Sequence, residues 1–447
     1  MKRTLLFILA LSSIWSYSFS QKFDTQTYSL QECLTIAVQN NYDLIVYRAG
    51  LEAAAANKTS AFGSFLPSVQ FSGGYSRTLN QQGGRTVFVG GQVIPIGAPS
   101  PNSYNMGLSA NLQLFDGLSR EANYRAADYN YKSADLNLQQ GIVNVKIDVY
   151  RQFFDYATKK QIVQSRRDNF EQGKKELESI QAQNQAGVIP ISVVYSKEAD
   201  LGTLELDLSR AENDLNISRA NLLSIMGLDP TNNVDFSIVD IKTEISQSDM
   251  QDFRNRIGNF EKTVQEALKN RYDYQSGESS TKSAEEQVSI SRSAYFPSLQ
   301  LGGGWSWSNN EFNQFDTYGR SYFGLNLSVP IFDRFMTNSN IEQSQYGLKQ
   351  AEVQQLKLVQ SIKIQVEQAF LTLDATEKQI QISQKAFNAA DMNYKVLQGR
   401  FEVGSSNITE LIQANTQFLT AKINQITSVF GYLLAQKELE YAIGRLN

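Results

Sequence analysis

The sequence contains no histidine, one cysteine and only eight prolines in 447 residues. The absence of histidine excludes a Ser-His-Asp triad, a zinc site with histidine ligands and a histidine pH switch. One cysteine can form neither an internal disulfide nor a thiolate metal cluster. The chain carries 41 basic and 45 acidic residues, so no excess of positive charge favours a nucleic-acid partner. We therefore expect a protein without a metal, a cofactor or a catalytic site.

Long apolar runs are also lacking, except for one short run near the N-terminus. Lys2 and Arg3 precede an apolar stretch over residues 5–14, and small serines follow before Gln21. This order of charged, apolar and small residues predicts a secretory signal peptide over residues 1–20, cleaved near Ser20. The stretch is too short to cross a bilayer as a helix. We expect an exported protein whose mature chain has no transmembrane helix.

The remainder of the chain contains two copies of one unit. Residues 65–76 match residues 295–306 at six of twelve positions, an offset of 230. The later matches, which share an offset of 217, pair Phe115 with Phe332, Gly187 with Gly404 and Gly227 with Gly444. The offset falls by 13 residues within 79–103, a stretch rich in glycine, glutamine, asparagine and proline, and loops tolerate such insertions.

This internal match divides the chain into four parts. They are the signal peptide (1–20), a first repeat (21–227), a connecting segment (228–258) and a second repeat (259–447). We expect a helix over about 30–62 in the first copy. We expect strands near 67–78 and 104–115 in the first copy, and near 297–308 and 320–332 in the second. Long helical hairpins are expected over 116–227 and 333–445.

The strands and the helices are predicted from two different periods. Apolar and small polar residues alternate along each expected strand, which is typical of a membrane barrel strand and equally of a soluble sandwich. In the expected hairpins, apolar residues recur every seven positions, as in a coiled coil. Asp116 and Asp333 stand where each could cap the first helix of a hairpin. Seventy helical residues span about 105 Å.

Four strands pose a geometric problem if they lie in a membrane. The smallest membrane barrels have eight strands, and open sheet edges are not tolerated in lipid. Several copies of the chain must then share one barrel. The strands would lie at one end of each copy, with the helical hairpins extending away from them. The expected fold class is an α+β membrane protein with two tandem helix–strand–strand–helix–helix repeats.

This doubled unit resembles the TolC-like outer-membrane efflux proteins. Short stretches that carry the resemblance are residues 65–68, 186–188, 402–404 and 443–444. The resemblance implies a homotrimer in the outer membrane of a Gram-negative-type cell, with a shared 12-stranded β-barrel and a periplasmic α-barrel. It implies a passive duct of a tripartite efflux or type I secretion system, which receives substrates from a periplasmic adaptor and an inner-membrane pump.

The resemblance also assigns roles near the far ends of the hairpins. The turns that it implies as adaptor-docking tips contain Gly187, Val188, Ile189 and Pro190 in the first copy, and Gly404 and Ser405 in the second. Residues that match the family's closed entrance by position are Phe401, Glu410, Gln413 and Val193. Only Glu410 keeps a charge there. Because it lies three residues after Asn407, the spacing of a capping box, a helix cap is at least as good an interpretation.

The opposite end carries aromatic residues. Tyr75, Tyr104, Trp305 and Trp307 are expected to form an aromatic girdle of the barrel, although bulky residues that fill a sandwich core would give the same pattern. Residues 79–103 and 309–320 would then be extracellular loops. Two other classes remain in view. A periplasmic coiled-coil adaptor would need one hairpin rather than two, and an exported enzyme would need a catalytic constellation that the sequence does not contain.

Overall fold

The computed structural model describes residues 27–79, 85–96, 100–239 and 241–446. The predicted signal peptide lies outside the described residues. The chain forms two compact units. The hairpin unit consists of Met1–Ala37, Val149–Ile245 and Ser383–Phe430, and the sheet unit of Val38–Asp148, Ser246–Ile382 and Gly431–Asn447.

The helices of the two copies have equal lengths. In the first copy the helices are α1 (Leu30–Asn40), α2 (Tyr42–Gly63), α3 (Ser119–Gln185) and α4 (Ile191–Ile225). Their counterparts are α6 (Phe260–Asn270), α7 (Tyr272–Ser293), α9 (Met336–Glu402) and α10 (Ile408–Ala442). Each of the first two pairs is offset by 230 residues and each of the last two by 217. An extra helix, α5 (Gln247–Ile257), precedes the second copy.

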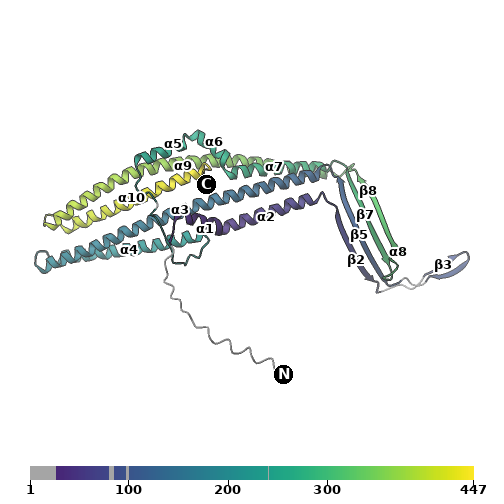
Figure 1. Cartoon of the computed structure of the whole chain (residues 1–447), viewed down its shortest axis with the longest axis horizontal. Coiled ribbons are helices and arrows are strands. Elements are labelled where there is room, and N and C mark those ends of the chain that lie inside the picture. The colour runs from purple at the N-terminus through teal and green to yellow at the C-terminus, as the bar shows by residue number, and fades with distance from the viewer. Residues whose placement is uncertain (1–26, 80–84, 97–99, 240, 447) are drawn as a thin grey trace, which may run out of the picture. The chain divides into compact units, whose positions relative to one another are not determined.

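Four antiparallel strands form one sheet in the sheet unit. They are β2 (Ser68–Arg77), β5 (Asn102–Phe115), β7 (Ser298–Asn309) and β8 (Gly319–Ser328), in the order β2-β5-β7-β8 (Figure 1). The register places Phe71 opposite Leu108 and Leu108 opposite Trp305. Because side chains alternate across a strand, this register gathers the apolar residues on one face and small polar residues on the other. β2 and β8 form the edges of this sheet.

Two parts of the expected secondary structure need correction. The helix expected over 30–62 is interrupted at Asn41, which has an extended ψ of 131°. Its side-chain Oδ1 accepts hydrogen bonds from the backbone of Asp43 and Leu44, which caps a new helix rather than continuing the old one. The second correction concerns the expected loop 79–103. It contains a two-stranded hairpin of β3 (Arg85–Val89) and β4 (Gln92–Ile96).

Two short strands hold the connecting segment in the hairpin unit. β1 (Thr27–Tyr28) pairs in parallel with β6 (Asp235–Phe236). Phe236 is fully buried there and its ring meets that of Tyr156 at 5.0 Å. Lys160 donates to both carboxylate oxygens of Asp235, at 2.7 and 2.9 Å. These contacts fix the connection between the two copies against α3.

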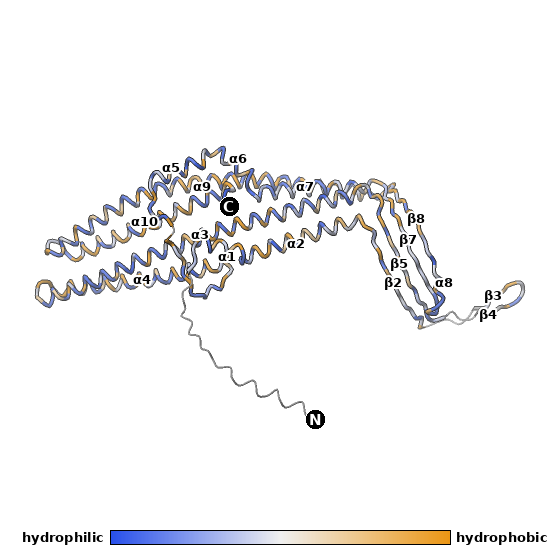
Figure 2. The backbone as a smooth tube through the Cα atoms, in the orientation of Figure 1, coloured by the Kyte–Doolittle hydropathy of each residue, from blue (hydrophilic) through white to orange (hydrophobic). Residues whose placement is uncertain are grey.

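The long helices mix apolar and polar residues along their whole length. Figure 2 shows hydrophobic and hydrophilic residues alternating along α3, α4, α9 and α10. None of the helices in the described part of the chain combines the length and the apolar character that a membrane span requires.

Both carboxylates expected to cap the hairpins do so. Asp116 accepts from the backbone N–H of Ser119 at 3.1 Å, and Asp333 from that of Thr337 at 2.7 Å.

Candidate functional site

The turns of the two helical hairpins lie at the same end of the hairpin unit (Figure 1). Gly187 and Gly404 adopt φ values of +73° and +74°, the left-handed region that favours glycine. In the first turn, the N–H of Val188 bonds to the carbonyl of Gln183 at 2.9 Å. In the second, the N–H of Ser405 bonds to the carbonyl of Arg400 at 2.8 Å. Both turns are therefore Schellman motifs, which end α3 and α9 by satisfying their last carbonyls.

The residues predicted to dock an adaptor are mostly accessible. Gly187, Pro190, Gly404 and Ser405 are exposed, and Val188 is 71% exposed. Ile189 is half-buried, and its carbonyl accepts from the side-chain amide of Asn184 at 2.7 Å. A Cβ added to Gly187 or Gly404 would meet no atom within 4 Å. The tips thus present small and apolar groups on turns that backbone hydrogen bonds close.

A hydrophobic cluster joins the two hairpins just behind these turns. Its buried core contains Ile180 of α3, Val194 of α4, and Ile408 and Leu411 of α10. Two of the residues predicted to line the closed entrance, Phe401 and Val193, pack against this core. Their position gives both side chains a packing role within one chain. Whether they also line an entrance stays a prediction.

The other two predicted entrance residues, Glu410 and Gln413, are exposed on α10. Glu410 takes part in a cap of this helix, because its backbone N–H donates to Asn407 Oδ1 at 2.9 Å. Its carboxylate accepts from Asn407 Nδ2 at 3.1 Å and from the Ser406 hydroxyl at 2.6 Å. The reciprocal pair of bonds is a variant of the capping box. The cap interpretation is thus satisfied in the structure, and a Glu410 ring stays a prediction.

A buried ion cluster lies one to two turns further from the tips. Lys197 of α4 is only 1% exposed, and its Nζ lies 2.7 Å from Glu176 Oε2 and 2.9 Å from Asp200 Oδ2. Tyr394 of α9 donates its hydroxyl to Glu176 Oε1 at 3.0 Å. The cluster therefore links three helices of the hairpin unit through charge-assisted hydrogen bonds.

The two ionisable donors of this cluster have raised pKa values. Burial lowers the pKa of Lys197, but its hydrogen bonds to Asp200 and Glu176 outweigh burial and leave the pKa above 10.5. Burial, followed by the negative charge of Glu176, raises the pKa of Tyr394. Both groups therefore stay protonated at neutral pH, where each serves as a hydrogen-bond donor.

Sequence reasoning missed this cluster, although a signal was present. The offset of 217 pairs Lys197 with Ala414, which is 2% exposed on α10. Lys197 also lies between Val194 and Leu201 of the apolar seven-residue series. A charged residue at a core position of a heptad needs a partner in the interior. The position of Lys197 in the series is therefore the sequence signal for the buried cluster.

The four aromatic residues predicted as a girdle lie on one face of the sheet. The register sets Tyr75 opposite Tyr104, with ring centroids 4.9 Å apart, and places Trp305 and Trp307 on the same apolar face. Tyr75 is 56% exposed, whereas Trp307 is 1% exposed because Phe312 and Phe315 cover its ring. Three rings thus reach the surface of this chain, and the fourth is covered by the loop after β7.

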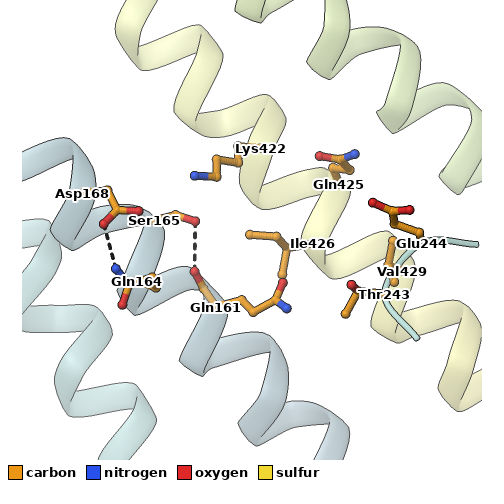
Figure 3. Close-up of a pocket in the computed structure, with 10 residues that line it drawn as sticks. All are labelled: Gln161, Gln164, Ser165, Asp168, Thr243, Glu244, Lys422, Gln425, Ile426 and Val429. Atoms are coloured by element: carbon orange, nitrogen blue, oxygen red, sulfur yellow. Dashed lines mark hydrogen bonds between the residues drawn. The ribbon is translucent and has the colours of Figure 1, made fainter. Parts of the chain in front are cut away.

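A polar hollow of about 440 Å³ opens between α3, α10 and the segment before α5 (Figure 3). Lys422 and Asp168 flank it, and Gln164 donates to Asp168 Oδ1 at 2.7 Å. The hollow has no arrangement of nucleophile and base. Across the described residues, no three carboxylates or thiols are grouped so as to hold a metal ion.

Cys33 is equally unsuited to chemistry. It is fully buried in α1, and burial raises the pKa of its thiol to about 12. The thiolate, which is the reactive form of cysteine, is therefore scarce at neutral pH. Cys33 therefore acts as a small buried hydrophobe.

Known proteins share this architecture. A family model described as outer membrane efflux protein matches residues 34–228 and 263–445. The outer membrane protein TolC of Salmonella enteritidis is 27% identical over 173 residues, which is 37% of this chain and 35% of that protein. TolC of Vibrio cholerae serotype O1 is 22% identical over 425 residues, covering 94% of this chain and 91% of that protein. The first alignment therefore spans about a third of its relative.

A solved structure agrees with the fold. The CmeC outer membrane channel of Campylobacter jejuni superimposes with a TM-score of 0.76 at 18% identity, covering 93% of this chain and 85% of that chain. At this identity the likeness shows the fold alone. The fold class expected from the sequence, with tandem helix–strand–strand–helix–helix repeats and long coiled-coil-like helices, is confirmed.

Proposed function

The chain belongs to the outer membrane efflux protein family, and on that premise we propose that it is the outer-membrane duct of a tripartite efflux or type I secretion system. Three chains form a homotrimer and share one 12-stranded barrel. A periplasmic adaptor docks at the hairpin tips and connects the duct to an inner-membrane pump. Substrates pass through without chemical change, so the protein is a channel and not an enzyme.

The observation that carries this proposal is the four-stranded sheet. Its outer face exposes large apolar side chains, including Phe323 at 77% and Leu325 and Leu327 at 62% and 64%. Its other face carries serine, asparagine, glutamine and glycine, with Tyr322 and Arg320 as the two larger side chains. A strand of a membrane barrel has an apolar face in contact with lipid and a polar face in contact with water, and this sheet has both. The two edges, β2 and β8, still need partners, and other copies of the chain supply them.

The oligomer is tested by the native mass of protein extracted from the outer membrane in mild detergent, measured by light scattering. A mass near three chains of 50.2 kDa, less the signal peptides, is expected. Two chains would give eight strands and overturn the trimer. A single chain would leave both sheet edges open and overturn the barrel, in favour of a periplasmic scaffold.

The docking role of the tips is tested by replacing Gly187 and Gly404 with leucine. A leucine at φ near +73° costs about 1 kcal/mol in backbone strain, yet it meets no neighbouring atom in the chain. We expect the trimer to assemble and export to be lost, because the added side chains project into the adaptor contact.

Gly258→Leu is the matched control for the tip variants. Gly258 has a φ of +87° and the same open surroundings, but it lies between α5 and α6. Its ψ of −160° lies in a region that essentially only glycine adopts, so its replacement should impose at least as much strain and still leave export intact. Normal export by the tip variants would overturn the docking proposal. Equal loss of export in all three variants would assign the effect to strain.

A further inference from the structure

The polar face of the four-stranded sheet carries a single charged side chain. Side-chain alternation and the register of the described strands assign serine, asparagine, glutamine, glycine and Tyr322 to this face, together with Arg320. Arg320 is the second residue of β8 and pairs with Ser306 of β7. It is exposed. If this face lines the pore, as the proposed function requires, the wall contributes one cation per chain and no anion.

Arg320 borders a hollow of about 560 Å³ on this face. Six of the residues that line the hollow are Ser72, Asn105, Ser306, Ser308, Thr317 and Arg320. They come from all four strands and from α8 (Phe315–Tyr318), the short helix before β8. No residue that lines the hollow is acidic. The nearest acidic residues along the chain are Glu311 in the loop and Asp316 in α8, and neither lines the hollow.

Small residues keep the hollow open. A Cβ on Gly107 would lie 3.3 Å from the Ser72 hydroxyl oxygen, and a Cβ on Gly74 would lie 2.5 Å from Asn105 Oδ1. Larger side chains at these two positions would therefore displace Ser72 and Asn105 from their present places. Gly107 itself lines the hollow, so a larger residue at this register position would narrow it.

The chemistry of the lining favours one class of ligand. A guanidinium has five N–H donors and no acceptor, and it matches the two oxygens of a carboxylate or phosphate. The serine hydroxyls and the Asn105 amide add donors around it, whereas the Thr317 hydroxyl donates to Asp316 Oδ1 at 3.5 Å. We propose that this hollow is an anion-binding site at the barrel mouth, and that Arg320 makes the mouth favour carboxylate- or phosphate-bearing solutes. The inference rests on the proposed function, because only a barrel turns this face toward the pore.

In a trimer, the positive charge of Arg320 occurs three times around the pore. Three copies of Arg320 ring one pore, and rings of charged side chains set the ionic preference of channels. A lipid phosphate is excluded as the ligand by position, since lipid contacts the opposite face. The ligand is therefore an anion dissolved in the pore.

The test compares Arg320→Gln with Arg320→Lys in planar bilayers. Reversal potentials under a potassium chloride gradient give the ratio of cation to anion permeability. Three unit charges about 10 Å from the pore axis, screened by about 0.1 M salt, predict that this ratio rises about twofold in Arg320→Gln. Arg320→Lys keeps the charge and should keep the wild-type ratio. Inorganic phosphate should reduce the wild-type chloride current and not that of Arg320→Gln.

Arg77→Gln is the matched control. Arg77 is the last residue of β2, at the same end of the sheet, but its register places it on the apolar face. Its replacement should leave unchanged both the ratio of cation to anion permeability and the reduction of the chloride current by phosphate. Unchanged readings in Arg320→Gln, or equal changes in Arg77→Gln, would overturn the anion site while leaving the channel in place. A wild-type protein that forms no channel would instead overturn the proposed function, and the inference with it.

Discussion

The two hairpins of this chain have the same lengths and different interiors. α3 and α9 both contain 67 residues, and α4 and α10 both contain 35. Yet the first hairpin buries Lys197 where the second buries Ala414. The start of α4 also differs from that of α10. Pro190 begins α4 without a side-chain cap, whereas Asn407, its counterpart at an offset of 217, accepts from the backbone of Glu410.

This contrast separates what the fold requires from what it permits. Equal lengths keep the turns of both hairpins at the same end of the hairpin unit. The residues buried between the helices can differ in kind, because each copy packs its own set of partners around a charged group in the first hairpin and a methyl group in the second. Polar features that occur in one copy alone are therefore the places where the copies can have acquired separate roles.

The largest effect is expected from Lys197→Ala, which places in the first hairpin the residue that the second hairpin buries at the matching position, Ala414. The change leaves Glu176 and Asp200, whose side chains are 14% and 10% exposed, without their cation. Breaking a buried ion pair by removing one partner costs about 3–5 kcal/mol. We expect a lower midpoint of guanidinium-induced loss of helical circular dichroism.

Lys174→Ala is the control for this variant. Lys174 pairs with Glu171 at 3.1 Å, and both side chains are about half exposed, at 45% and 56%. An exposed pair contributes less than about 1 kcal/mol. Equal midpoints for the two variants would mean that the buried cluster adds no stability. Adding Glu176→Gln and Asp200→Asn to Lys197→Ala should recover part of the loss, since no uncompensated charge then remains.

The pH dependence of this effect has a definite sign. Because the pKa of Lys197 is raised above 10.5 in the folded chain, its contribution is fully present below pH 10.5 and is lost as the pH rises through the folded value. The difference between the wild type and Lys197→Ala should therefore stay constant through the neutral range and shrink only at strongly alkaline pH. A difference that shrinks near pH 7 would contradict this assignment.

A smaller effect is expected from Asn407→Ala, which gives α10 the uncapped start of α4. The loss of an asparagine cap costs about 1 kcal/mol. The same unfolding measurement on Pro190→Ala provides the comparison between copies, because Pro190 makes no side-chain cap bond. We expect Asn407→Ala to be the more destabilised of the two. The reverse order would show that the fixed φ of Pro190 matters more than the cap of α10.

The sequence predicted the fold well because its strongest signals are repeated. The seven-residue apolar series and the alternating strands each occur twice, at two fixed offsets. Features that depend on a single side-chain hydrogen bond or on the register between strands were missed. In the sequence, Asn41 is one more polar residue within a helical pattern. In the structure, its side chain accepts hydrogen bonds from the backbone N–H groups of Asp43 and Leu44 and begins a new helix. Arg320 becomes distinctive only once the register shows that no other strand places a charge on its face.

The smallest effect on stability is expected from Glu410→Gln. The same variant distinguishes the two roles considered for Glu410, a helix cap and a charged ring around the pore. The backbone N–H at this position still donates to Asn407 Oδ1, so the cap persists and the midpoint of unfolding should move by only a few tenths of a kcal/mol. If three Glu410 side chains ring the pore, removing their charge lowers its preference for cations in single-channel recordings. The shift is opposite in sign to that expected for Arg320→Gln. An unchanged preference would assign Glu410 to the helix cap alone, because the cap is the one role that glutamine preserves.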